Sequence, residues 1–162
     1  MARALIVGCG CRGRELADRL VERDLLVRGT SREPAGLEAI EAAGLEAAEA
    51  DPDRPGTILD LCGDVSVVVW LLASANGAPN SVSAIHGPRL ERLVEKLVDS
   101  PVRGFAYEAA GSVEPSELLR GRAIVEGAGE RWRIPFAILT GSRDRPGWAE
   151  RTADEVAGLL AG

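Results

Sequence analysis

The chain has 162 residues, of which 46% are hydrophobic and 27% charged, and its formal net charge at pH 7 is −6. This length suits a single domain with its own core, and the composition is that of a soluble globular protein. The negative charge argues against a general nucleic-acid or anionic-membrane binder, because both need a cationic surface. We expect a cytoplasmic protein, since the sequence has neither an apolar run of membrane-spanning length nor a signal-peptide pattern.

Apolar runs alternate with amphipathic segments along the chain, which predicts βαβ units and a parallel sheet. Strands are expected at 4–7, 25–28, 45–50, 65–72, 102–110 and 134–140. Helices are expected at 14–21, 34–44, 57–61, 89–98, 115–128 and 148–160, with a turn at 51–56 and a loop at 73–81. This order predicts a doubly wound, three-layer α/β fold that spans residues 1–162 as one domain, without a separate substrate domain.

The first predicted strand runs into Gly8-Cys9-Gly10-Cys11-Arg12-Gly13, a complete G-x-G-x-x-G. Between a strand and a helix, this spacing is typical of a dinucleotide-binding loop. Gly8 permits the tight turn, Gly10 lets the backbone approach the pyrophosphate, and Gly13 lets the helix pack near the strand. The helix N-terminus then offers free N–H groups to the phosphates. The alternative is a glycine-rich turn that binds nothing.

The tip of the second predicted strand distinguishes the two nicotinamide cofactors. An NAD-binding protein usually has a carboxylate there for the ribose 2′-hydroxyl, but this chain has Gly29-Thr30-Ser31-Arg32. Ser31 and Arg32 can bind a 2′-phosphate, and Arg12 is a further candidate for the same phosphate or the pyrophosphate. The sequence therefore favours NADP, whereas Glu33 keeps NAD as the second choice. Alternatively, Arg12 and Arg32 are solvated surface arginines.

The three cysteines fit no metal-ligand spacing, so no metal site is expected. Cys9, Cys11 and Cys62 are interpreted as small apolar residues of a reducing compartment. The alternative is a redox role for Cys9 and Cys11, which lie in the glycine loop.

With these motifs placed, the chain resembles the atypical and extended short-chain dehydrogenase/reductases, which include sugar-nucleotide epimerases and dehydratases and NmrA-like redox sensors. The resemblance covers nearly the whole chain, through the glycine loop and the segments GTSR, EADPDRP, VVVWLLA, VRGFAYEAAGSV and IPFAILTGS. It implies a Rossmann fold, contact of Asp51 with the adenine, and a cofactor-ribose wall made by Leu72, Ala73 and Ser74. Asp51 is alternatively a helix cap.

The resemblance also exposes departures from the family pattern. Active members carry Tyr-x-x-x-Lys after the fifth strand, where this chain aligns Leu118 with the Tyr and Arg122 with the Lys. An apolar Leu118 cannot transfer a proton, so the family's mechanism is expected to fail here. The only tyrosine, Tyr107, lies within a strand and has no Lys four residues later.

Other family positions differ as well. The family's assisting Ser or Thr positions align with Ala109 and Ala110, and Ser112 is the candidate to replace them. The C-terminal substrate lobe of extended members is not expected in this chain.

A few other residues are weak catalytic candidates. His86, the only histidine, is a candidate general acid, although a helix-start or surface role is favoured. Glu108, at the tip of the fifth strand, is a candidate for orienting a substrate or holding a helix N-terminus. Asp144 and Trp148 are candidates for a short lid, but Trp148 is favoured as core or interface, and Trp70 is assigned to the core.

Two functions are consistent with these features. The first is an NADP(H)-binding oxidoreductase or epimerase-like enzyme acting on a small substrate. The second is a non-catalytic NADP(H)-binding protein, either a redox sensor or a partner subunit, and the missing Tyr and Lys favour it. A fold that has lost its cofactor is a weaker third alternative. A homodimer or a partner chain is plausible for a protein of this size.

Overall fold

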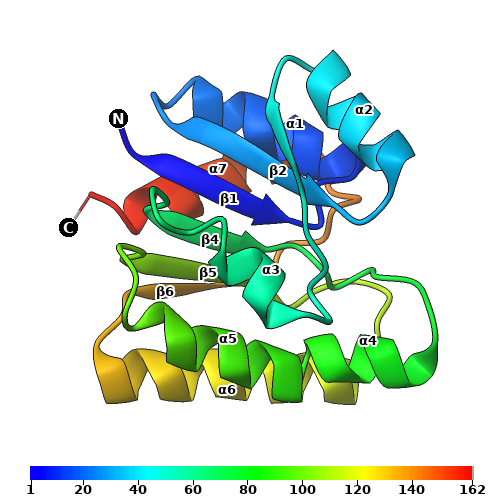
Figure 1. Cartoon of the computed structure of the whole chain (residues 1–162), viewed down its shortest axis with the longest axis vertical. Helices are drawn as coiled ribbons and strands as arrows, with labels where there is room; N and C mark the ends of the chain where they lie inside the picture. The colour runs from blue at the N-terminus through cyan, green and yellow to red at the C-terminus, as the bar shows by residue number, and fades with distance from the viewer. Residues whose placement is uncertain (162) are drawn as a thin grey trace.

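A computed structural model describes residues 1–161 and shows six parallel strands in one sheet, covered by helices on both faces (Figure 1). The strands are β1 (Arg3–Val7), β2 (Leu26–Ser31), β3 (Glu46–Glu49), β4 (Val67–Trp70), β5 (Gly104–Glu108) and β6 (Phe136–Leu139). The helices are α1 (Cys11–Val21), α2 (Pro34–Ala42), α3 (Pro55–Leu59), α4 (Pro79–Ile85), α5 (Pro88–Leu97), α6 (Pro115–Trp132) and α7 (Trp148–Gly158). The predicted doubly wound α/β fold is confirmed.

The strand order is β3-β2-β1-β4-β5-β6, which is that of a Rossmann fold. β1 pairs with β2 on one side, where Ala4 lies opposite Val27, and with β4 on the other, where Ala4 lies opposite Val67. The strands that follow β1 therefore extend the sheet in one direction, and those that follow β4 extend it in the opposite direction. In open α/β sheets, ligands bind in the crevice at this point, beyond the carboxyl ends of the strands.

The central strands are buried on both faces, which is why they appear in the sequence as continuous apolar runs. Side chains along β1 alternate between two core clusters. Leu5 and Val7 join the cluster under α3, α5 and α6, whereas Ala4 and Ile6 join the one under α1 and α7. Figure 1 shows α1 above the sheet and α5 and α6 below it, with α7 behind the strands.

Two helices differ from the prediction. Residues 73–81 were expected to form a loop, but α4 begins at Pro79, a residue that fits the first helical position because it lacks an N–H. α6 continues past Gly127 to Trp132 and ends at Arg133, whose φ is +55°. Gly121 lies where α6 packs against the buried side chain of Tyr107, so a residue without a Cβ fits this position.

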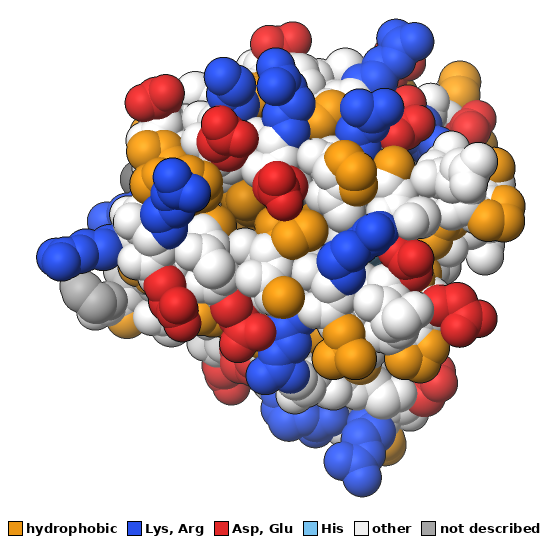
Figure 2. Space-filling view, turned by 90° about the horizontal axis from the view of Figure 1, so that it is seen from below, with side chains coloured by type: hydrophobic (Ala, Val, Ile, Leu, Met, Phe, Trp, Pro, Cys, Tyr) orange, Lys and Arg blue, Asp and Glu red, His pale blue; other side chains and the backbone are white. Residues whose placement is uncertain are grey.

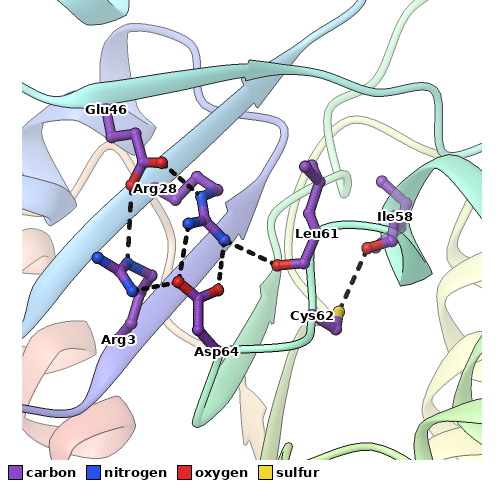
Figure 3. A network of polar contacts seen from close by, with 7 residues as sticks. All are labelled: Arg3, Arg28, Glu46, Ile58, Leu61, Cys62 and Asp64. Atoms are coloured by element: carbon purple, nitrogen blue, oxygen red, sulfur yellow. Dashed lines mark hydrogen bonds and ion pairs between the residues drawn. The ribbon is translucent and has the colours of Figure 1, made fainter.

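A polar network joins the first three strands to the turn before β4 (Figure 3). The guanidinium of Arg28, in β2, donates to Glu46 at 2.9 Å and to Asp64 at 2.8 Å, and also to the carbonyl of Leu61. Arg3 in β1 forms ion pairs with the same two carboxylates. These carboxylates raise the pKa of Arg28, so the guanidinium stays charged, and its contacts are structural.

The outer face of α5 and α6 carries arginine, acidic and apolar side chains intermingled (Figure 2). Among the described residues, no helix is both long and apolar enough to cross a membrane.

Candidate functional site

The glycine loop connects β1 to α1 in a conformation that requires glycine. Gly8 has a φ of +89°, and a Cβ there would lie 2.6 Å from the carbonyl oxygen of Leu71. Gly10 caps α1 without a side-chain hydrogen bond, and no protein atom lies within 4 Å of a Cβ built on it. The first turn of this 11-residue helix therefore faces open space with its N–H groups uncapped, as an anion-binding turn does.

A groove of about 420 Å³ runs over this loop, and we call it the narrow groove. The tip of β2, the turn after β3 and the segment after β4 form its other walls. Most of the predicted cofactor residues line it, namely Gly8, Gly10, Ser31, Arg32, Asp51, Leu72 and Ser74.

The remaining predicted cofactor residues lie outside the narrow groove. Cys11 and Gly13 form the first turn of α1, and Ala73 is fully buried. Arg12 lines a second groove instead, and Glu15, from outside that groove, forms an ion pair with it at 2.9 Å. The arginine that lines the narrow groove from α1 is Arg14. Residues two apart on a helix point to different sides, so a helical projection of α1 would have separated Arg12 from Arg14.

The tip of β2 brings both Arg32 and Glu33 to the narrow groove. Arg14 and Arg32 both line it, and neither forms an ion pair with any described residue. The hydroxyl of Ser31 accepts a hydrogen bond from the Glu33 N–H at 3.1 Å, which fixes the turn into α2. Gly36 brings α2 close to Ser31, because any Cβ at Gly36 would overlap its side chain.

Asp51 begins the turn after β3. One carboxylate oxygen accepts the N–H of Asp53 at 2.9 Å, so the side chain is held in a local turn at the wall of the narrow groove. It caps this turn rather than a helix, because α3 begins only at Pro55.

The two cysteines of the glycine loop differ in accessibility. Cys9 is buried, with its sulfur packed against Gly29 of β2, and burial raises the pKa of its thiol to about 11. A neutral buried thiol is unreactive, which agrees with the packing interpretation for Cys9. Cys11 is exposed, and all three cysteines are free.

The second groove, of about 810 Å³, lies beyond β5 and β6 and beside the start of α6, and we call it the wide groove. Leu118 and Arg122, at the positions aligned with the family's Tyr and Lys, both line it. Ala109, Ala110 and Ser112 line it too. None of the described residues that line it is a histidine, tyrosine, lysine or cysteine.

Arg143 stands where the two grooves meet, and nothing in the sequence analysis singled it out. It lines both grooves, together with Ser74. Its Nε and Nη2 donate to the two carboxylate oxygens of Glu108, at 2.6 and 2.7 Å, and Nη2 also donates to the carbonyl of Leu71. Glu108 is itself buried and accepts the N–H of Ala73 at 3.0 Å. Glu108 therefore orients Arg143 and does not itself line either groove.

His86 is not a surface residue but a fully buried one at the end of α4. Its Nε2 lies 2.9 Å from the carbonyl oxygen of Leu72, which can only accept, so Nε2 carries the proton. Nδ1 then accepts from the hydroxyl of Tyr107 at 2.7 Å. Burial lowers the pKa of His86 and raises that of Tyr107, so both are neutral. Neither lines a groove.

The two remaining candidates lie after β6. Asp144 is exposed and lines the wide groove, whereas Trp148 is buried as the first residue of α7. The Arg143 guanidinium lies over the Trp148 ring, 5.9 Å from its centroid. Trp148 thus belongs to the core and supports Arg143, as a cation–π neighbour.

No family model and no curated protein matches the sequence. Solved structures do share its fold. UDP-glucuronic acid 4-epimerase from Bacillus cereus, in complex with NAD, is 19% identical, with a TM-score of 0.64 over 89% of this chain and 59% of its own. Triphenylmethane reductase from Citrobacter sp., complexed with NADP(H), is 18% identical, with a TM-score of 0.62 over 86% and 49%. UDP-glucose 4-epimerase from Thermotoga maritima is 14% identical, with a TM-score of 0.68 over 89% and 58%.

These similarities confirm, at the level of the fold, the resemblance predicted from the sequence. The chain spans between about half and three-fifths of the length of these three proteins.

Proposed function

We propose that this chain binds NADP(H) in the narrow groove, with the pyrophosphate over the glycine loop and the 2′-phosphate at the tip of β2. The observation that carries the proposal is the pair of guanidiniums of Arg14 and Arg32, which line the same groove as Ser31 and form no ion pair with any described residue. An unpaired guanidinium can form a bidentate, charge-assisted contact with a phosphate. NAD, which lacks this phosphate, would leave both charges uncompensated.

The other contacts implied by the resemblance are consistent with this placement. Asp51 lines the narrow groove on the side of β3, which suits an adenine contact. Leu72 and Ser74 line it after β4, which suits a ribose contact, while Ala73 supports them through its N–H to Glu108. The nicotinamide would then lie towards Arg143, where the wide groove begins.

Calorimetric titration with NADPH and NADH tests the proposal. We expect NADPH to bind at least about tenfold more tightly than NADH, a difference of about 1.4 kcal/mol. Arg14→Gln and Arg32→Gln should each reduce this preference. Arg92→Gln removes the same charge from α5, outside both grooves, and should leave it unchanged. Equal affinities for the two nucleotides, or a preference unaffected by Arg14 and Arg32, would overturn the proposal.

The activity that this placement supports is hydride transfer to or from a small substrate in the wide groove. A non-catalytic role is a second candidate, because the wide groove offers no imidazole, phenol or lysine for proton transfer. Such a protein would sense the redox state of the cofactor or complete a site shared with a partner chain or a second copy. The affinities for NADP⁺ and NADPH separate the two candidates: a sensor requires about a tenfold difference.

A further inference from the structure

The wide groove displays three guanidiniums from separate parts of the chain. Arg12 comes from α1, Arg122 from α6 and Arg143 from the segment after β6. Among the described residues, Asp144 supplies the only carboxylate that lines the same groove. Guanidiniums therefore outnumber carboxylates in the lining of this groove, although the chain as a whole has a net charge of −6.

Each of these arginines is held from outside the groove by a glutamate. Glu15 pairs with Arg12 at 2.9 Å, Glu126 with Arg122 at 3.3 Å, and Glu108 with Arg143 at 2.6 Å. None of the three glutamates lines the wide groove. A guanidinium has five N–H donors, and these contacts use only part of them. The glutamates therefore orient the arginines while donors remain for a ligand.

Arg143 is the most firmly fixed of the three. Its Nε and Nη2 are bound to Glu108 and to the Leu71 carbonyl, while Nη1 forms no hydrogen bond with any described residue. Its side chain is 22% exposed and that of Glu108 only 1%. A guanidinium held in this way loses little side-chain entropy when it binds an anion, which is the benefit of preorganisation.

Part of the wall of the wide groove is apolar. Val113 and Leu118 are buried at its base, and Leu119 is 66% exposed, an unusual position for a large aliphatic side chain in a charged surface. Apolar side chains beside fixed arginines suit a ligand that has an apolar body and an anionic group.

We propose that the wide groove binds small organic oxyanions, in which a carboxylate or phosphate on an apolar body contacts Arg122, Arg143 and Arg12. This class of ligand would be the substrate, or the regulator, of the proposed NADP(H) site. In this respect the inference rests on the proposed function. Leu118 and Arg122 then recognise the ligand instead of transferring its proton.

Three probes of one shape test this inference: benzoate, phenyl phosphate and the neutral benzamide. Each is titrated up to 10 mM into ¹³C-methyl-labelled protein, with and without saturating NADP⁺, and the methyl signals of Val113, Leu118 and Leu119 are followed. We expect benzoate or phenyl phosphate to shift these signals, with an affinity at least about tenfold higher than that of benzamide. Which of the two anions binds more tightly identifies the anionic group.

Arg122→Gln should weaken the binding of the preferred anion at least about fivefold, whereas the matched Arg92→Gln should not change it. Equal shifts with benzamide, no shift with either anion, or equal losses in the two variants would overturn the inference. Anion binding without nucleotide binding would refute the proposed function alone, and nucleotide binding without anion binding would refute this inference alone.

Discussion

At the scale of the residue, His86 and Tyr107 show that titratable side chains near a candidate site can hold its walls in place without lining it. His86 joins the segment after β4 to β5, through Leu72 and Tyr107, and both ring nitrogens are satisfied. Because the imidazole is buried and neutral, its protonation in the folded state would add a charge among apolar neighbours. We therefore expect His86 to make the free energy of unfolding depend on pH.

Burial lowers the pKa of His86 from the ordinary 6.5. As the pH falls below about 6.5, the unfolded chain binds a proton that the folded protein does not, so the free energy of unfolding decreases. The contribution is fully present above pH 6.5 and is lost on acidification towards the folded pKa, with a slope of at most about 1.4 kcal/mol per pH unit. Urea unfolding at several pH values between 7.5 and 5.5 measures this slope.

The control is His86→Gln, which retains every carboxylate of the protein. This variant should be less stable at pH 7.5, where the wild-type hydrogen bonds are intact, and its free energy of unfolding should vary less with pH. An unchanged slope would show that the acid sensitivity comes from other groups.

Single residues also show where sequence reasoning reaches its limit. Ser31 and Arg32 could be placed because they lie at the end of a strand, and a strand tip at the carboxyl edge faces the ligand side. Arg12 and Arg14 could not be told apart without the rotation of α1. The Glu108–Arg143 ion pair joins positions 35 residues apart, and no local pattern indicates such a contact.

At the scale of the element, two of the three glycines of α6 have opposite surroundings. Gly121 is buried, and a Cβ there would overlap the side chain of Tyr107, whereas a Cβ on the exposed Gly127 would meet no atom within 4 Å. Gly121→Ala should therefore destabilise the protein by about 2 kcal/mol, because overpacking a core outweighs the gain in helix propensity.

Gly127→Ala is the matched substitution in the same helix. It should stabilise the protein by up to about 1 kcal/mol, because alanine loses less backbone entropy in a helix. Thermal unfolding of both variants measures whether each substitution stabilises or destabilises the protein. Two changes of the same sign would contradict the packing of α6 against Tyr107.

The elements also differ in how well the sequence predicts them. β1 and β4 are buried on both faces, and their apolar runs are unmistakable. α4 was missed because its seven residues follow a segment rich in Ala, Asn, Gly and Ser, which is typical of a loop. Tertiary contacts hold it, including the hydrogen bond from Trp70 Nε1 to the carbonyl of Ile85. Such contacts override local propensity.

At the scale of the whole molecule, the strand order gathers the site from segments that are distant in sequence. The glycine loop, the tip of β2 and the segment after β4 all lie beyond the carboxyl ends of neighbouring strands. The polar network of Arg3, Arg28, Glu46 and Asp64 lies outside both grooves. The sequence predicted the narrow groove because its residues follow strand ends. It did not predict the wide groove, whose arginines converge only through the packing of α6 and the segment before α7.

The central claim, that the narrow groove holds a nicotinamide dinucleotide, is tested most directly by titrating ¹⁵N-labelled protein with NADP⁺ and mapping the amide signals that move. The account predicts the largest shifts at Gly10, Cys11 and Arg32, with little change at Glu46 and Asp64. Shifts that avoid the glycine loop, or none at millimolar NADP⁺ or NAD⁺, would mean that the loop is only a turn and would contradict the account.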